Sequence, residues 1–364
     1  MTVEGPDSPL AFLRARSGII LLVGLASGVG LLVWALIAPS GAVGAGWAIG
    51  LVFWLSIALG SMGLLAIHAV TGGRLRAVLW PAVAPAAASL PAFGLLMLPL
   101  LAAVPLIYPW YTDPSRAGHP DVVSLYLNLP GFAARSALAI IGWSVIALVL
   151  LGRRPHPLFG IFGLLFYLVM ITIIGVDWVL SVKPRFRSSD YGGLLFVTQL
   201  LAALAWTATL RTAPPGRAGA AGDLGAMMLA AALGAAYLGF VQYLVIWYGD
   251  LPSKAEWFIL RWSPGWVWLE GVSLALSVFL PFGALLARQI RQSPAALMHI
   301  GACVLAGILA HYIWFIAPPH GFAALPAAAL GVLAVGGLWM GLAYGPIAAR
   351  LVPVSHAGET AHGG

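Results

Sequence analysis

Ten stretches of this chain are each long and apolar enough to cross a lipid bilayer as an α-helix. A spanning helix needs about 20 mostly apolar residues, and in lipid the backbone polar groups must be bonded within the helix itself. The stretches that qualify are residues 17–38, 45–70, 78–107, 133–151, 157–181, 191–210, 224–247, 265–287, 295–316 and 323–345. The sequence therefore predicts an all-α integral membrane protein with ten transmembrane helices.

Composition excludes several other classes of protein. Only 8% of the residues are charged and 61% are hydrophobic, whereas a soluble domain carries roughly a quarter charged residues. The net charge of +7 is therefore interpreted as a signal of membrane orientation and not of nucleic-acid binding. The single cysteine, Cys303, excludes an internal disulfide, a thiolate zinc site, an iron–sulfur cluster held by this chain alone and covalent haem attachment.

The distribution of arginine and lysine predicts that both termini are cytoplasmic. Eleven of the 18 basic residues fall on the side of the termini in a ten-span topology, and cytoplasmic loops carry the excess of positive charge. We expect a cytoplasmic N-terminal tail over residues 1–16 without a signal peptide, a membrane domain over 17–347 and a cytoplasmic C-terminal tail over 348–364.

The third span is expected to be kinked or partly broken. It contains five prolines, and proline inside a helix removes a backbone hydrogen bond and clashes with the preceding turn. These residues are Pro81, Pro85, Pro91, Pro99 and Pro105.

Two acidic residues, Asp177 and Glu270, lie within predicted spans. Gln242, Tyr243 and His311 fall at a similar depth toward the outer face. Ionisable groups inside a membrane are costly and usually mark ion pairs, proton paths or ligand sites. We expect a proton path or a quinone-facing site from these five residues.

Structural alternatives remain open for these polar groups. Asp177 could pair with Lys183 or with an arginine of its own loop, Glu270 could pair with Arg261, and His311 could be a hydrogen-bonded core residue.

His68 lies toward the cytoplasmic end of the second span. With Ser56 and Ser61 it could line a cytoplasmic half-channel, and with His299 it could ligate a haem. Nothing in the sequence enforces the histidine pairing, so a water-lined or hydrogen-bonded histidine is favoured and no metal site is predicted.

One outer loop contains three basic residues, Lys183, Arg185 and Arg187. The positive-inside rule instead favours basic residues in cytoplasmic loops. This exception suggests contact with a partner or a paired acid. The aromatic outer loops, with Trp247, Tyr248 and Asp250, form either an interfacial belt or a docking surface.

Two stretches carry a resemblance to a known family. DWVLSVKPRFRSSDYG, which begins at Asp177, resembles the D-W-x-M-S-(L/V)-(D/E)-P-(H/E)-(W/F)-x-S-(T/S)-x-(F/Y)-G signature of the large membrane subunits of alternative complex III. VIWYGDLPSKAEWFILRW, residues 245–262, resembles the (I/V)-W-x-G-(N/D)-L-P-x-(E/K)-x-x-W-(Y/F)-x-x-R segment of the smaller subunit, ActF. These subunits belong to the NrfD/polysulfide-reductase membrane-subunit superfamily. The chain departs from the signature at Lys183 and Arg185, which stand where the family has acidic or histidine residues.

The resemblance implies two four-helix bundles, residues 45–181 and 191–316, flanked by the first and last helices, in a bacterial inner membrane. It implies as partners an NrfD-like quinol-oxidising sister subunit, an iron–sulfur protein and cytochrome c subunits. We therefore predict a cofactor-free subunit of a quinol:cytochrome c oxidoreductase-type complex, structural and either proton-conducting or quinone-facing, that binds a quinone or a phospholipid. A structural anchor without chemistry and a secondary transporter are the alternatives.

Overall fold

The computed structural model describes residues 9–72, 76–117, 120–152, 156–186, 188–211, 218–249 and 252–352, and every regular element in these ranges is a helix. Nine of the described helices are long and apolar enough to cross a membrane, or ten if one bent pair is counted as a single span. The predictions of an all-α protein and of a multi-pass membrane protein are confirmed.

The spans overlap the predicted ones, with ends that differ by up to six residues. The unbroken ones are α2 (Ser17–Trp34), α3 (Ser40–Thr71), α9 (Leu129–Leu150), α10 (Pro157–Trp178), α11 (Tyr191–Thr209), α12 (Ala218–Gly249) and α17 (Pro294–Ile316). Two further spans each contain a π-helical turn: α14 (Trp266–Leu274), η3 (Ala275–Phe279) and α15 (Leu280–Leu286) form one, and α18 (Ala324–Trp339), η5 (Met340–Tyr344) and α19 (Gly345–Leu351) form the other.

The proline-rich third span is broken, as predicted. It consists of α4 (Arg76–Ala88), α5 (Ala92–Leu96) and α6 (Leu98–Ile107), with a bend of 50° between residues 88 and 92. At the bend, the Ser89 hydroxyl donates to the carbonyl of Ala86 at 2.7 Å and accepts a hydrogen bond from Trp339 Nε1 at 2.7 Å. Helix α18 thus supplies a polar partner at the point where the backbone hydrogen bonds of the third span are interrupted.

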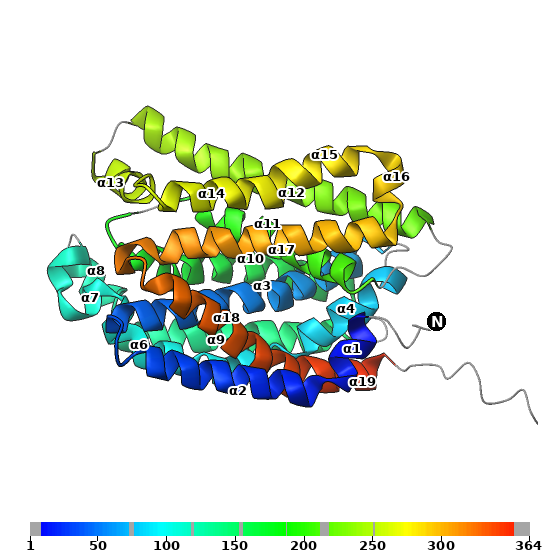
Figure 1. Cartoon of the computed structure of the whole chain (residues 1–364), viewed down its shortest axis with the longest axis horizontal. Helices are drawn as coiled ribbons and strands as arrows, with labels where there is room; N and C mark the ends of the chain where they lie inside the picture. Colours follow the sequence, from blue (N-terminus) through cyan, green and yellow to red (C-terminus); the bar gives the residue numbers. More distant parts are fainter. Residues whose placement is uncertain are drawn as a thin grey trace, which may run out of the picture.

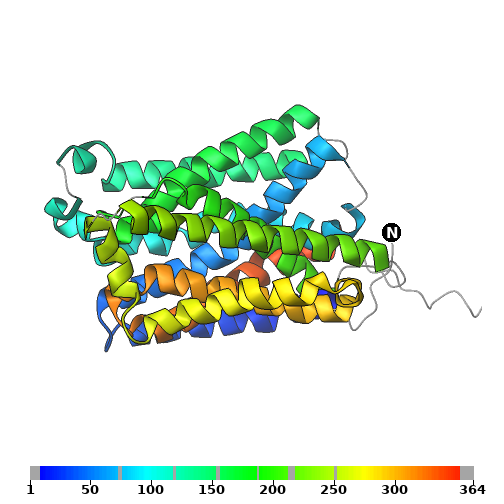
Figure 2. The same ribbon diagram turned by 90° about the horizontal axis from the view of Figure 1, so that it is seen from above.

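Helix α3 is the most buried span and packs against α18, α11, α10, α4, α6 and α9. Its glycines lie directly against neighbouring backbones: Gly46 and Gly50 face Ala327 and Gly331 of α18, and Gly60 faces the Gln199 carbonyl of α11. Small residues permit this close approach, which is the main source of helix association in lipid. Figure 2 shows α9 and α10 along one edge of the molecule and α14 and α15 near the opposite edge.

Six short helices gather at one end of the molecule (Figure 1), which we call the loop end. They are α7 (Pro109–Thr112), η1 (Pro114–Ala117), α8 (Pro120–Leu125), η2 (Leu180–Val182), α13 (Pro252–Arg261) and η4 (Pro318–His320). The opposite, terminal end carries α1 (Pro9–Ala15), α16 (Arg288–Arg291) and α19, and there Arg14 donates to the Ala349 carbonyl at 3.3 Å. The first and last described helices therefore lie at the same end.

Candidate functional site

A cavity of about 500 Å³ lies between α11, α12, α13, α14, η3 and α17. We call it the membrane cavity. Its wall is mainly apolar and aromatic, and the polar side chains among its lining residues include Gln242, Tyr243, Glu270 and His311. Four of the five intramembrane residues that the sequence placed at one depth therefore share one cavity. Asp177 does not line it.

The cavity opens sideways, toward the surface that faces lipid. Helix α12 packs against α15 and η3 near the terminal end and against α13 near the loop end, while α12 and α14 diverge toward the loop end (Figure 1). Two lining phenylalanines, Phe240 of α12 and Phe279 of η3, are 58% and 67% exposed. Exposed aromatic side chains therefore stand at the margin of the cavity, on helices that are apolar enough to span a membrane.

Glu270 of α14 and His311 of α17 form a pair within the cavity. The imidazole Nδ1 lies 3.1 Å from each carboxylate oxygen, and the two side chains are 19% and 17% exposed. A carboxyl and an imidazole at this distance can share one proton, either as an ion pair or as a neutral hydrogen-bonded pair. Such a pair can accept or release a proton beside a bound molecule.

Two buried donors in the cavity wall, Gln242 Nε2 and Trp314 Nε1, have no hydrogen-bond acceptor among the described residues. Leaving a buried donor unsatisfied costs about 1–3 kcal/mol. Buried polar groups are nearly always paired in native proteins, so each exception requires an explanation. Both atoms have almost no exposed surface, so a molecule in the cavity could bond to them only after a side-chain rearrangement.

Helix α13 closes the cavity toward the loop end. Its Trp257 and Phe258 line the cavity, and Trp257 stacks on Phe186 with ring centroids 4.2 Å apart. Arg261, at the end of α13, is buried and donates to the Trp257 and Trp314 carbonyls at 3.1 Å and also to the Phe315 carbonyl. These three main-chain carbonyls, one from α13 and two from α17, take the place of a carboxylate partner. The alternative that paired Arg261 with Glu270 is therefore wrong.

The π-helical turn η3 lies in the cavity wall through Ser277, Val278 and Phe279. Gly307 of α17 faces it so closely that an added Cβ would lie 2.7 Å from the Ser277 nitrogen. A π-turn inside an α-helix occurs mostly at functional positions. Here it lies on the helix that also carries Glu270.

Asp177 is locked in a separate ion pair. Its oxygens accept hydrogen bonds from Arg135 Nε at 2.7 Å and from Arg135 Nη2 at 3.0 Å, and Asp177 is fully buried. Arg135 also donates to the Tyr126 carbonyl at 2.8 Å and lies 3.9 Å above the Tyr126 ring. The pair joins α9 to α10. The alternative that paired Asp177 with Lys183 is wrong, because Lys183 bonds Glu256 at 2.7 Å.

The remaining sequence-predicted residues lie away from the membrane cavity. His68 is in the last turn of α3, at the terminal end, and His299 is exposed near the start of α17. Within the described ranges, no group of three residues has the composition and spacing of a metal site.

Of the loop residues expected to contact a partner, Lys183, Arg185, Trp247 and Tyr248 are described, and they are at the loop end. Arg185, Trp247 and Tyr248 are exposed there. Arg187 and Asp250 lie outside the described residues.

Arg135 is not recognisable as the partner of Asp177 when it is counted only as a charge that reports orientation. Its place near the start of the fourth predicted span, at the depth of Asp177, is the signal that could have revealed the pair. The aromatic wall formed by Trp257, Trp262 and Trp314 was also missed, since periodicity does not separate an aromatic cavity wall from a membrane-interface belt.

His320 of η4 provides a pH test of the loop end. Burial lowers the pKa of its imidazole from 6.5 to about 4. The unfolded chain then binds more protons than the folded protein between these pH values, so stability falls as the pH drops through this window. We expect the melting temperature in detergent to fall between pH 7 and pH 5, and the fall to be smaller in a His320→Gln variant. An identical pH dependence in the variant would show that other groups cause the fall.

No protein-family model matches this chain, and no curated protein matches it in sequence. The class that the fold defines is an α-helical multi-pass membrane protein. Its distinguishing feature is a laterally open aromatic cavity with a carboxyl–imidazole pair in its wall.

Proposed function

We propose that this chain is an integral-membrane subunit of a quinol-oxidising respiratory complex, and that its membrane cavity receives the headgroup of a quinone. The observation that carries the proposal is the Glu270–His311 pair, 3.1 Å apart, within a cavity open to lipid. The resemblance of residues 177–192 and 245–262 to subunits of alternative complex III supports the same class of complex.

A quinone headgroup matches the chemistry of this cavity. Its ring is flat and apolar and can stack on the aromatic wall, and its two oxygens can accept hydrogen bonds from polar side chains that line the cavity. Oxidation of a quinol to a quinone releases two protons and two electrons. In this proposal the Glu270–His311 pair accepts one proton and the second passes to water, while both electrons pass to the redox centres of an iron–sulfur protein and cytochrome c subunits.

We propose further that the chain has ten spans, arranged as two bundles with a fixed orientation in the membrane. The bent pair is one span, which makes ten, and residues 45–181 and 191–316 form two bundles with the first and last helices beside them. Both termini face the cytoplasm of a bacterial cell, and the loop end faces the partner subunits: an NrfD-like sister, an iron–sulfur protein and cytochrome c subunits.

A structural anchor is the second candidate, and the Asp177–Arg135 pair favours it. A carboxylate sealed against a guanidinium can pin α9 to α10 without moving protons. An anchor would copurify without quinone and would show no saturable quinone binding.

Quinone binding can be tested on the purified protein in nanodiscs. We expect a short-chain benzoquinone to quench tryptophan fluorescence saturably, because Trp257, Trp262 and Trp314 line the cavity. Glu270→Gln is expected to weaken binding of the corresponding quinol about tenfold, the effect of losing one hydrogen bond from a quinol hydroxyl to a charged group. Glu256→Gln makes the same chemical change outside the cavity and is expected to leave binding unchanged.

Non-saturable quenching that is equal in wild-type protein and in Glu270→Gln would contradict the proposal. That result would indicate simple partition of the quinone into the bilayer and would favour the anchor.

A further inference from the structure

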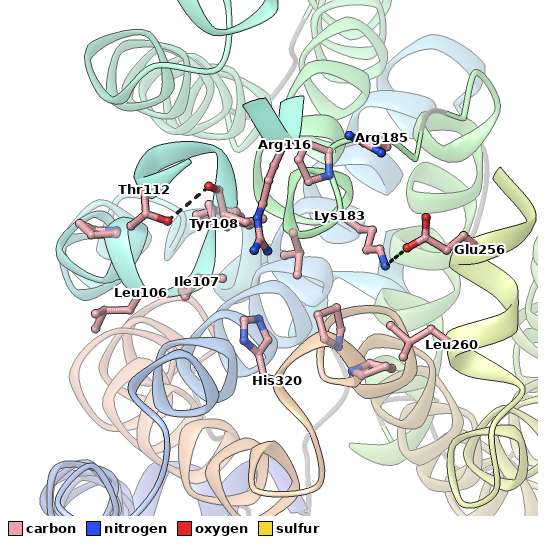
Figure 3. A pocket seen from close by; sticks show the side chains of 16 residues that line it. Leu106, Ile107, Tyr108, Thr112, Arg116, Lys183, Arg185, Glu256, Leu260 and His320 are labelled. Atoms are coloured by element: carbon pink, nitrogen blue, oxygen red, sulfur yellow. Dashed lines mark hydrogen bonds and ion pairs between the residues drawn. The ribbon is translucent and has the colours of Figure 1, made fainter. Parts of the chain in front are cut away.

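A second hollow, of about 720 Å³, lies at the loop end (Figure 3), and we call it the loop-end pocket. Its walls come from the junction of α6 and α7, from η1, from η2 and the residues after it, from α13 and from η4. The surrounding helices are seen nearly end-on in Figure 3. Arg116, Arg185 and Glu256 at its margin are exposed. The pocket therefore opens toward water and not sideways into lipid.

The inner wall of the loop-end pocket is rigid and partly apolar. Prolines from four separate segments line it together with Ile107, Val182 and Leu260. Proline has a fixed φ and no backbone N–H, so these walls resist rearrangement and offer few main-chain donors. The prolines are Pro105, Pro109, Pro184, Pro318 and Pro319.

The charge at the margin is mainly positive. Arg116, Lys183 and Arg185 line the pocket against one acid, Glu256. Lys183 is paired with Glu256 at 2.7 Å, and Arg116 is paired with Asp113 at 3.3 Å. Arg185 has no ion pair with any described residue, so its guanidinium can receive an incoming carboxylate.

His320 forms part of the pocket wall. Its imidazole lies beside Gly41, whose added Cβ would be 2.8 Å from the His320 Nδ1. The other ring nitrogen, Nε2, is buried without a hydrogen-bond partner among the described residues. Figure 3 shows the ring in the pocket wall, opposite Arg116 and Lys183.

We propose that the loop-end pocket docks an acidic loop of a partner protein, with its carboxylates on Arg185 and Lys183 and an apolar side chain on the proline-lined wall. An apolar centre inside a charged margin is the usual anatomy of a protein interface. The opening toward water disfavours a phospholipid, whose acyl chains need a lipid-facing exit. This inference deepens the partner-binding part of the proposed function and is independent of the quinone site.

The test uses the full-length protein in nanodiscs of neutral lipid and a fluorescein-labelled peptide with glutamates on both sides of a central leucine. We expect saturable binding by fluorescence anisotropy that weakens with salt. Arg185→Glu is expected to weaken binding about tenfold, as loss of a charge-assisted contact predicts. Glu256→Gln is expected to tighten binding, because it frees Lys183. Arg288→Glu makes the same charge reversal at the terminal end and is expected to have no effect.

Three outcomes would overturn the proposal. One is equal binding by wild-type protein and Arg185→Glu. Another is equal binding of a peptide with lysine in place of glutamate. The third is displacement of the peptide by inorganic phosphate, or by anionic lipid vesicles, at the same concentration of anionic groups, which would indicate a small-anion or headgroup site. Quinone titration of Arg185→Glu separates this proposal from the first, since the membrane cavity does not contain Arg185.

Discussion

Replacing Arg135 with glutamine is expected to destabilise the folded protein by about 3–5 kcal/mol, the usual cost of removing one partner from a buried ion pair. Asp177 is fully buried and its side chain is held by two hydrogen bonds from Arg135. Without the guanidinium, the carboxylate would either remain charged in a low-dielectric interior or take up a proton. Both consequences disfavour the native packing of α9 on α10.

The matched variants separate charge from shape. Asp177→Asn leaves the guanidinium partly solvated, because the Arg135 side chain is 18% exposed, so its effect should be smaller. The double variant Arg135→Gln/Asp177→Asn should recover part of the loss, since no uncompensated carboxylate remains. Thermal unfolding in detergent, followed by tryptophan fluorescence, measures all three. A melting temperature of Arg135→Gln equal to that of wild type would contradict the role of the pair.

Asp177→Asn also tests the proton-path prediction for this residue. Lower quinol:cytochrome c activity in a fully assembled complex would support that role. Unchanged activity, or loss of assembly, would support the structural role that the ion pair suggests.

Gly60→Ala is expected to cost about 3 kcal/mol, the upper part of the usual range for overpacking. The added Cβ would lie 1.8 Å from the Gln199 carbonyl oxygen, so α3 and α11 would have to separate. The Gln199 side chain also accepts a hydrogen bond from Tyr167 at 2.5 Å, and this bond depends on the position of α11. The same melting assay measures the loss.

Gly271→Ala in α14 is the control for this prediction. An added Cβ meets no atom within 4 Å there, and alanine is a better helix former than glycine by about 1 kcal/mol. We expect its melting temperature to be unchanged or raised. Equal losses in the two variants would show that helix propensity, and not the α3–α11 contact, sets the effect.

Helix α13 contributes to both hollows of the molecule. Trp257 and Phe258 line the membrane cavity, whereas Glu256 and Leu260 line the loop-end pocket. Gly265, which follows α13 with φ +96°, adopts a backbone conformation that favours glycine and turns the chain into α14. The two hollows therefore share one helix but are lined by different side chains of it.

The intramembrane site could be predicted only in part. Counting from the ends of the spans placed Gln242, Tyr243, Glu270 and His311 at one depth, and the structure brings these four into one cavity. The same count grouped Asp177 with them, which does not hold, because Asp177 packs against Arg135 of α9. Depth follows from position along a helix, but the direction of a side chain around the helix does not.

The sequence by itself determined the class of fold, the bounds of the spans and the break in the proline-rich third span. Each of these depends on residues that are close in the chain, through the length of an apolar run or the missing N–H of proline. Only the tertiary structure decided which charged groups pair and which polar groups share a cavity. The spans are apolar around most of their circumference, so their facing is set by contacts between distant segments, such as Gly46 with Ala327 and Gly60 with Gln199.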